Sequence, residues 1–153
     1  MDLILWRHAE AEDQLAGQTD MERSLTPRGE RQARRMAEWL AQRLAPSTRV
    51  LVSPARRTRQ TAQALKRDFE VVAALAPGAS AADLLSAARW PQSAEPVLIV
   101  GHQPTLGLVA ARLLAGADQP WSVKKAAVWW LTRREREGAA QVTLLAVLGP
   151  DQV

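Results

Sequence analysis

A short apolar run near the start of the chain ends directly in two residues that could do chemistry. Leu3 to Trp6 are apolar, and Arg7 and His8 follow without a linker. Buried strands of α/β proteins are continuous apolar runs, and ligands bind beyond their carboxyl ends. Arginine grips anions with a planar fork, and histidine is a nitrogen nucleophile or general base at neutral pH. A histidine at this position can also simply cap the strand. Arg7 and His8 therefore indicate a functional site only if other parts of the chain supply matching residues.

Two later segments have the same layout, with an apolar run, a turn and a helix start. Their sequences are Val50-Leu51-Val52-Ser53-Pro54 and Val97-Leu98-Ile99-Val100-Gly101-His102-Gln103-Pro104. Serine followed by proline is typical of a helix N-terminus, where backbone N–H groups attract anions. Arginines follow the first segment, and His102 is the only other histidine of the chain. Three strand ends that each deliver a cation or an imidazole suit a phosphoryl group, whose oxygens need several donors at once.

These segments resemble the motifs of the histidine phosphatase superfamily, which includes phosphoglycerate mutases and acid phosphatases. The matching residues are Arg7-His8-Ala9, Arg23-Ser24-Leu25-Thr26-Pro27-Arg28-Gly29, Ser53-Pro54 through Gln60-Thr61, and Gly101-His102-Gln103-Pro104. The likeness is closest to the small SixA-type phosphohistidine phosphatases and covers roughly the first 110 residues. Four motifs in this order are far more specific than any one of them.

The resemblance implies a role for each matched side chain. His8 would be the nucleophile, forming a phosphohistidine intermediate that water then hydrolyses. Arg7, Arg57 and His102 would hold the phosphoryl oxygens and stabilise the charge of the transition state. Arg23 would be either a further phosphate contact or an exposed loop arginine.

The choice of Arg57 among three neighbouring arginines follows from the same resemblance. The family arginine lies three residues before a Gln-Thr pair, which here is Gln60-Thr61. We expect Arg56 and Arg59 to point away from the site, because adjacent helical positions do not share a face.

The residue types also make chemical sense without the family. Attack by an imidazole splits one difficult hydrolysis into two easier displacements. The imidazole must be neutral, and nearby cations lower the pKa of a histidine. Guanidinium groups can take the part that Mg²⁺ plays in other phosphoryl-transfer sites. With no cysteine and two histidines, each already given a role, the chain is expected to use no metal and no cofactor.

The chain departs from the wider family in two places. Alanine follows the Arg-His pair where glycine is common, and Pro77 stands where many superfamily members carry a glutamate as general acid. The nearest alternative acids are Glu10, Glu12 and Asp83, and we expect each to be a surface carboxylate. A missing acid matters less when the leaving group is itself an imidazole.

Several functions therefore compete. The leading hypothesis is a phosphatase that removes phosphate from phosphohistidine on a protein partner, such as a histidine phosphotransfer domain. The alternatives are a small-molecule phosphomonoesterase of the same mechanism and a non-catalytic module that binds phosphate or a phosphoprotein. His8 and His102 argue against the module, since arginines alone would suffice for binding. A mutase is disfavoured because 153 residues leave little room for a second substrate site.

Length and composition agree with a globular enzyme. The 153 residues are expected to form one domain, 1–153, with 47% hydrophobic and 24% charged residues. A net charge of +4, with arginines spread along the chain, does not indicate nucleic-acid binding. The absence of cysteine suits a reducing compartment, and no run has the length of a signal or membrane-spanning segment. We therefore expect a soluble cytoplasmic protein without membrane partners.

Apolar runs and helical stripes alternate along the chain. Strands are predicted at 2–6, 49–52, 69–73 and 97–100, a strand pair at 126–132 and 141–148 around an exposed turn at 133–138, and helices at 27–44, 54–66, 80–89 and 104–115. This order predicts a three-layer α/β fold, with a largely parallel sheet of about six strands, helices on both faces and a C-terminal edge hairpin. We expect the six tryptophans to serve ordinary packing.

Overall fold

A computed structural model describes residues 1–153 as one central sheet with helices on both sides. The strands are β1 (Asp2–Arg7), β2 (Arg49–Val52), β3 (Glu70–Val71), β4 (Val97–Gly101), β5 (Val128–Arg136) and β6 (Ala139–Leu148), and the helices are α1 (Pro27–Ala41), α2 (Arg56–Gln63), α3 (Ala81–Ala87) and α4 (Thr105–Ala115). Two short 3-10 turns, η1 (Asp20–Glu22) and η2 (Ala73–Leu75), complete the chain. The strand order is β3-β2-β4-β1-β5-β6. The first four strands of that order are parallel to one another. β5 pairs antiparallel with β1, and β6 pairs antiparallel with β5.

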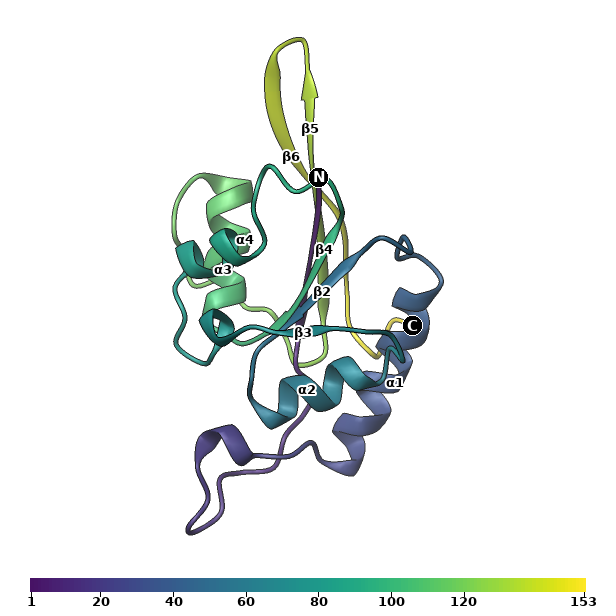
Figure 1. The fold of residues 1–153 in the computed structure, drawn as a ribbon, viewed down its shortest axis with the longest axis vertical. Helices are drawn as coiled ribbons and strands as arrows, with labels where there is room; N and C mark the ends of the chain where they lie inside the picture. The colour runs from purple at the N-terminus through teal and green to yellow at the C-terminus, as the bar shows by residue number, and fades with distance from the viewer.

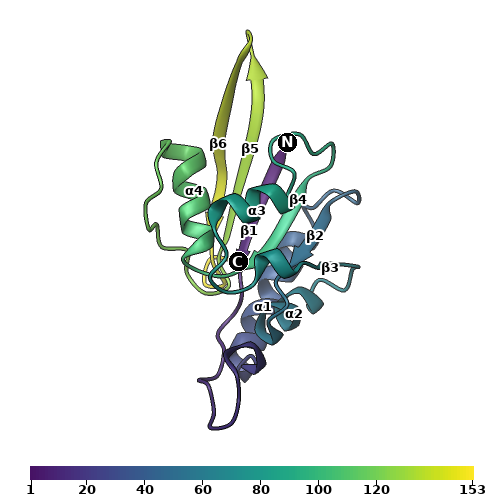
Figure 2. The same cartoon turned by 60° about the vertical axis from the view of Figure 1, so that its left-hand side comes forward.

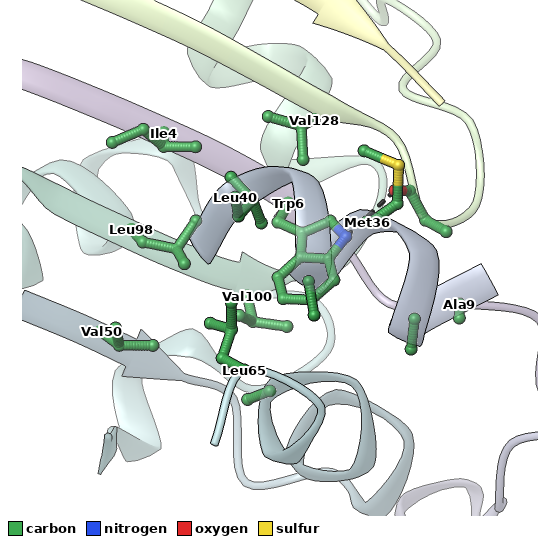
Figure 3. Close-up of a cluster of buried hydrophobic side chains, with 14 of the residues drawn as sticks. Ile4, Trp6, Ala9, Met36, Leu40, Val50, Leu65, Leu98, Val100 and Val128 are labelled. Atoms are coloured by element: carbon green, nitrogen blue, oxygen red, sulfur yellow. Dashed lines mark hydrogen bonds between the residues drawn. The ribbon is translucent and has the colours of Figure 1, made fainter. Parts of the chain in front are cut away.

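Alternation along the central strands separates the core into two layers. Ile4 and Trp6 of β1 face one side of the sheet, where α1 and α2 cover them, and Leu3 and Leu5 face α3 and α4 on the other. Figure 1 shows the two pairs of helices on opposite sides of the strands. Figure 3 shows the first layer, in which the buried Trp6 ring packs among aliphatic side chains and donates its indole N–H to the Ala126 carbonyl at 3.0 Å.

The predicted start of α1 is confirmed. Thr26 is the N-cap, its hydroxyl accepts the Gly29 N–H at 2.9 Å, and Pro27 is the first helical residue. Apolar residues at helical spacing are buried on one face of this segment, and they are Ala33, Met36, Ala37, Leu40 and Leu44. The helix ends at Ala41, earlier than the predicted residue 44, yet Leu44 still packs in the core.

The predicted fold class is confirmed, and the differences lie at element ends. β3 has two residues instead of the predicted five, both exposed at the sheet edge, and α3 is shorter than predicted. The prediction that Ser53 caps α2 is wrong. That helix begins at Arg56 with Ala55 as its N-cap, because the only backbone N–H that the Ser53 hydroxyl accepts is that of Ala55, at 3.4 Å and ahead of the helix. The same hydroxyl lies 2.7 Å from Nε2 of His102.

The C-terminal hairpin is longer than predicted. Residues 133–136 were expected in a turn, but β5 continues through them, and only Glu137 and Gly138 connect the two strands. Both have positive φ, 53° and 77°, which is the geometry of a tight two-residue hairpin turn. Figures 1 and 2 show this hairpin projecting past the rest of the sheet. Where the hairpin joins the sheet, Trp129 and Trp130 pack on opposite faces, as packing residues.

None of the helices has both the length and the apolar character needed to cross a bilayer.

Candidate active site

Three neighbouring strands end beside one another and present the chemically interesting residues. His8 follows β1, Ser53 follows β2 and His102 follows β4, which lies between those two strands in the sheet. Backbone hydrogen bonds fix these exits, since the His8 N–H donates to the Gly101 carbonyl at 3.2 Å and the Ser53 N–H donates to the Val100 carbonyl at 3.1 Å. Figure 1 shows that the chain continuing from β1 passes beyond this end of the sheet, opposite the projecting hairpin.

The ring of His8 is held in one orientation by its own turn. The side chain is buried, and Nδ1 lies 2.7 Å from the Ala9 carbonyl. A carbonyl only accepts, so Nδ1 carries the proton and Nε2 keeps its lone pair. Hydrogen bonds also connect this turn to α2, because Thr61 Oγ1 accepts the Ala9 N–H at 3.1 Å and donates to the Arg57 carbonyl at 2.8 Å. Nε2 is therefore the nitrogen of this ring that has a lone pair available.

His102 stands beside His8 and is held by partners at both ring nitrogens. The two ring centroids are 5.4 Å apart. Nε2 of His102 lies 2.7 Å from Ser53 Oγ, and Nδ1 lies 3.4 Å from Nη2 of Arg57. A hydroxyl can donate or accept, so Ser53 supports either tautomer of His102. His102 can thus accept from Arg57 or turn an Nδ1–H toward an anion.

Arg57 reaches the site from the first turn of α2 and is almost fully buried. Nη1 donates to the Asp20 carbonyl at 2.8 Å, and Nη2 donates to Asp20 Oδ2 at 3.0 Å. Its Nε is buried without a hydrogen-bond partner in the protein. Arg7 is arranged alike, with Nη1 donating to the Val123 carbonyl at 2.9 Å and a buried, unpartnered Nε. Unsatisfied buried N–H groups are costly, and a phosphoryl oxygen would satisfy them.

Arg23 lies at the edge of this group. Its Nε donates to the Glu12 carbonyl at 2.8 Å and its Nη1 donates to Asp20 Oδ1 at 3.1 Å. The guanidinium is close enough to lower the pKa of His8. The loop arginine is thus joined to the cluster through Asp20.

Burial and charge keep both histidines neutral. Burial lowers the pKa of His8 to about 4, and Arg57, Arg7 and Arg23 act in the same direction against the hydrogen bond to the Ala9 carbonyl. Burial and then Arg57 lower the pKa of His102 to about 3, with Asp20 opposing them. Burial, followed by Arg57, also lowers the pKa of Arg7. A neutral, nucleophilic His8 among cations is the state that attack on a phosphoryl group requires.

The side chains of the other residues considered from the sequence make no hydrogen bond to this cluster. Arg56 and Arg59 are exposed, as is Pro77. Asp83 is exposed in the N-terminal capping box of α3. Glu12 is also exposed.

The Glu10 carboxylate has partners outside the cluster, since it accepts a hydrogen bond from the Thr26 hydroxyl at 2.7 Å and lies 3.8 Å from Nη1 of Arg28. The carboxylate that does reach the cluster is Asp20, which sequence reasoning missed. Its only local signal was an acidic residue three positions before Arg23. The role of Ser53 was also missed, because the Ser-Pro pair suggested a helix cap.

A cleft of about 550 Å³ borders the cluster at Arg7 and runs along the segment after β6. Its charged lining residues are Arg7, Glu10, Arg28, Lys124, Lys125 and Asp151. Cations outnumber carboxylates here, so the surroundings of Arg7 favour an anionic ligand. No three histidine, aspartate or glutamate side chains lie close enough together to hold a metal ion.

The fold and this cluster define the class of protein. Residues 3–79 match the histidine phosphatase superfamily (branch 1), and the chain belongs to that family. It is a phosphatase, a hydrolase. The matched span contains His8, Arg23 and Arg57, while His102 lies beyond it.

Its relatives point to one branch of that family. The phosphohistidine phosphatase SixA of Escherichia coli is 33% identical over 129 residues, covering 78% of this chain and 78% of that protein. An uncharacterized protein of Picosynechococcus sp. is 34% identical over 150 residues, covering 93% of this chain and 88% of the relative. The solved structure of the protein histidine phosphatase SixA complexed with tungstate has a TM-score of 0.81 at 29% identity and covers 99% of both chains. The chain is similar to SixA in sequence and in fold.

Proposed function

We propose that this protein is a metal-independent phosphatase that removes phosphate from phosphohistidine on a protein, through a phosphohistidine intermediate at His8. The observation that carries the proposal is the orientation of His8, with Nδ1 committed to the Ala9 carbonyl and Nε2 left with its lone pair. The ring lies beside that of His102, which in turn contacts Arg57. The similarity to SixA proteins supports phosphohistidine as the substrate.

In the first step, Nε2 of His8 attacks phosphorus in line with the leaving group. The new Nε2–P bond forms as the substrate's P–N bond breaks, and the substrate side chain, already protonated by solvent on its other ring nitrogen, departs as a neutral imidazole. Arg7 and Arg57 offer their buried Nε–H groups to the phosphoryl oxygens. Donors fixed before the reaction stabilise the charge of the transition state without reorganisation.

In the second step, water attacks the phosphorus of phospho-His8. An O–P bond forms, the Nε2–P bond breaks with its electron pair returning to Nε2 of His8, and inorganic phosphate leaves with both protons of the water. His102 can hold an oxygen of the transferring group through Nδ1–H while Ser53 donates to Nε2. The hydroxyl thereby lets His102 change tautomer without losing its anchor.

The carboxylate arrangement favours a nitrogen leaving group. Pro77 is exposed and has no proton to donate, and the Glu10 carboxylate accepts a hydrogen bond from the Thr26 hydroxyl. Neither residue therefore supplies a proton to an alkoxide leaving group. An imidazole can be protonated before the P–N bond breaks, and it leaves without such help.

The test is a panel of substrates with the purified protein in EDTA. The panel contains a phosphohistidine protein domain, phosphoramidate, p-nitrophenyl phosphate and a sugar phosphate. We expect turnover of the first two in EDTA, together with a phosphoenzyme that is lost in acid. Equal kcat/KM on the sugar phosphate would favour a small-molecule phosphomonoesterase, and loss of activity in EDTA would refute metal independence.

A further inference from the structure

Asp20 is the one carboxylate that contacts two arginines of the cluster. Oδ2 accepts from Arg57 Nη2 at 3.0 Å, and Oδ1 accepts from Arg23 Nη1 at 3.1 Å. Its backbone carbonyl accepts from Arg57 Nη1 at 2.8 Å. Asp20 opens the short turn η1, which belongs to the long loop between β1 and α1, so these contacts join that loop to α2.

The two phosphate-facing arginines are held in the same manner. Arg7 is anchored at Nη1 by the Val123 carbonyl, and Arg57 is anchored at both Nη1 and Nη2 by Asp20. In both guanidinium groups the Nε is buried and has no partner. A hydrogen bond to one edge of a planar guanidinium group fixes the direction of the N–H groups on its other edges. The Asp20 contacts therefore leave Arg57 with a donor for a ligand.

We propose that Asp20 is a positioning residue that aims Arg57 at the phosphoryl group and draws Arg23 into the same site. This inference rests on the proposed phosphatase function and assigns a new residue to it. Asp20 acts through the two arginines and does not itself touch the substrate.

The loop around Asp20 is built to present it. Thr19 and Glu22 form a capping box at the ends of η1, with the Thr19 N–H donating to Glu22 Oε2 at 2.8 Å. On the far side of Arg23, the Leu25 N–H donates to Gln60 Oε1 of α2 at 2.7 Å. Figures 1 and 2 show this loop extending past the ends of the strands.

The carboxylate stays charged in this position. Partial burial raises the pKa of Asp20, but the hydrogen bonds from Arg23 and Arg57 outweigh burial and lower it below the ordinary value. An ionised carboxylate accepts from both guanidinium groups at once, whereas an asparagine can accept through only one oxygen.

Three variants separate positioning from other roles. Asp20→Ala removes both side-chain contacts, and Asp20→Asn keeps one acceptor while removing the same charge. Asp13→Asn is the matched control, because Asp13 is exposed in the same loop without a side-chain hydrogen bond or ion pair. The measurements are kcat and KM for phosphoramidate, the dissociation constant for tungstate by calorimetry, and the melting temperature.

We expect Asp20→Ala to lower kcat/KM by about 10- to 100-fold, since small misplacements of positioning groups cost that much. Tungstate should bind more weakly to the same variant. Asp20→Asn should fall between it and the wild type, and Asp13→Asn should match the wild type. The melting temperature should change little, because the Asp20 side chain is 46% exposed.

Other results would overturn the inference. Tighter tungstate binding by both Asp20 variants would mean that the carboxylate competes with phosphate and does not aim its ligand. Unchanged constants, or a loss explained wholly by unfolding, would leave Asp20 without this role. Tungstate binding needs no turnover, so weaker binding by Asp20→Ala in a protein inactive on phosphohistidine would refute the proposed function and support the positioning role.

Discussion

The imidazole rings of His8 and His102 lie with their centroids 5.4 Å apart and their planes inclined by 54°. They come from the ends of adjacent parallel strands, so the register of β1 against β4 sets this spacing. Both rings are neutral at pH 7, because burial and the surrounding arginines lower their pKa values. Neutrality leaves a lone pair on each ring, which the proposed mechanism uses for attack at His8 and for the hydrogen bond between His102 and Ser53.

Replacing the proposed nucleophile should abolish turnover and leave the fold intact. We expect His8→Ala to lower kcat by ~10⁴-fold or more, the scale seen when a nucleophile is removed. The side chain lies at a strand end and belongs to neither apolar cluster, so the melting temperature should stay near that of the wild type. Activity is checked with phosphoramidate and by trapping the phosphoenzyme. Near-normal turnover by this variant would mean that the mechanism is wrong.

Adjacent arginines on α2 give a matched pair of variants. Arg57→Ala should lower kcat/KM by ~10²–10³-fold, as for loss of one preorganised donor. Arg56→Ala should stay within about twofold of the wild type, because an exposed side chain distant from the reaction contributes little. Steady-state kinetics on one substrate tests both. A large effect of Arg56→Ala with a small effect of Arg57→Ala would reverse the assignment.

Substrate preference follows from the lack of a free acid. We expect P–N substrates to exceed unactivated alkyl phosphates in kcat/KM by ~10²–10⁴-fold, the usual contribution of general acid catalysis. The comparison needs phosphohistidine protein and a sugar phosphate under the same conditions. If the two rates are similar, an acid operates that the present geometry does not identify, and Glu10 or Glu12 would be tested first.

The lowered histidine pKa values predict a loss of stability in mild acid. Histidines of the unfolded chain take up protons near pH 6.5, whereas folded His8 and His102 do so only near pH 4 and pH 3. Between those values the unfolded state binds more protons, so the free energy of unfolding falls as pH falls. The slope should approach about 1.4 kcal/mol per pH unit for each histidine. Urea unfolding at pH 7, 6 and 5 measures it, and His8→Ala should remove about half of the histidine contribution. A flat profile for the wild type would contradict the neutral pair.

Gly29 should be intolerant of any side chain. A Cβ there would lie 1.9 Å from the Glu10 carbonyl oxygen, which also accepts the Thr26 N–H at 3.0 Å. We expect Gly29→Ala to destabilise the protein by about 1–3 kcal/mol, the range for overpacking. Glu30→Ala, at the exposed neighbouring position of the same helix, is the control. Equal unfolding free energies for both variants would show that the chain relaxes there at no cost.

Local signals in the sequence predict most of the fold and the centre of the site. The apolar runs before His8 and His102 are buried strands, and Thr26-Pro27 begins a helix, because these features depend on nearby residues. Asp20 could not be found in this way. It meets Arg57 only because the long loop after β1 returns to α2.

Competing uses of one residue type explain other misses. The Ser53 hydroxyl accepts the nearby Ala55 N–H and also meets the distant His102 imidazole, and only the sheet order brings that imidazole within reach. The hairpin turn was misplaced because charged residues suggested an exposed loop, although exposed strands carry charges equally well. Positive φ at Glu137 was not readable from its residue type.

The central place of β1 in the sheet has a consequence for how the chain reaches its folded state. Leu3 pairs with Val97 on one side and with Leu131 on the other, so this strand has no sheet partner among the residues that directly follow it. During synthesis from the N-terminus, the apolar strand β1 has no partner on either edge until β4 and then β5 have been made. Closing such long loops slows folding and leaves strand edges open to wrong partners. The segment that carries His8 is therefore among the last to gain its pairing, and a ribosome-bound chain should acquire phosphatase activity only after β5 has emerged.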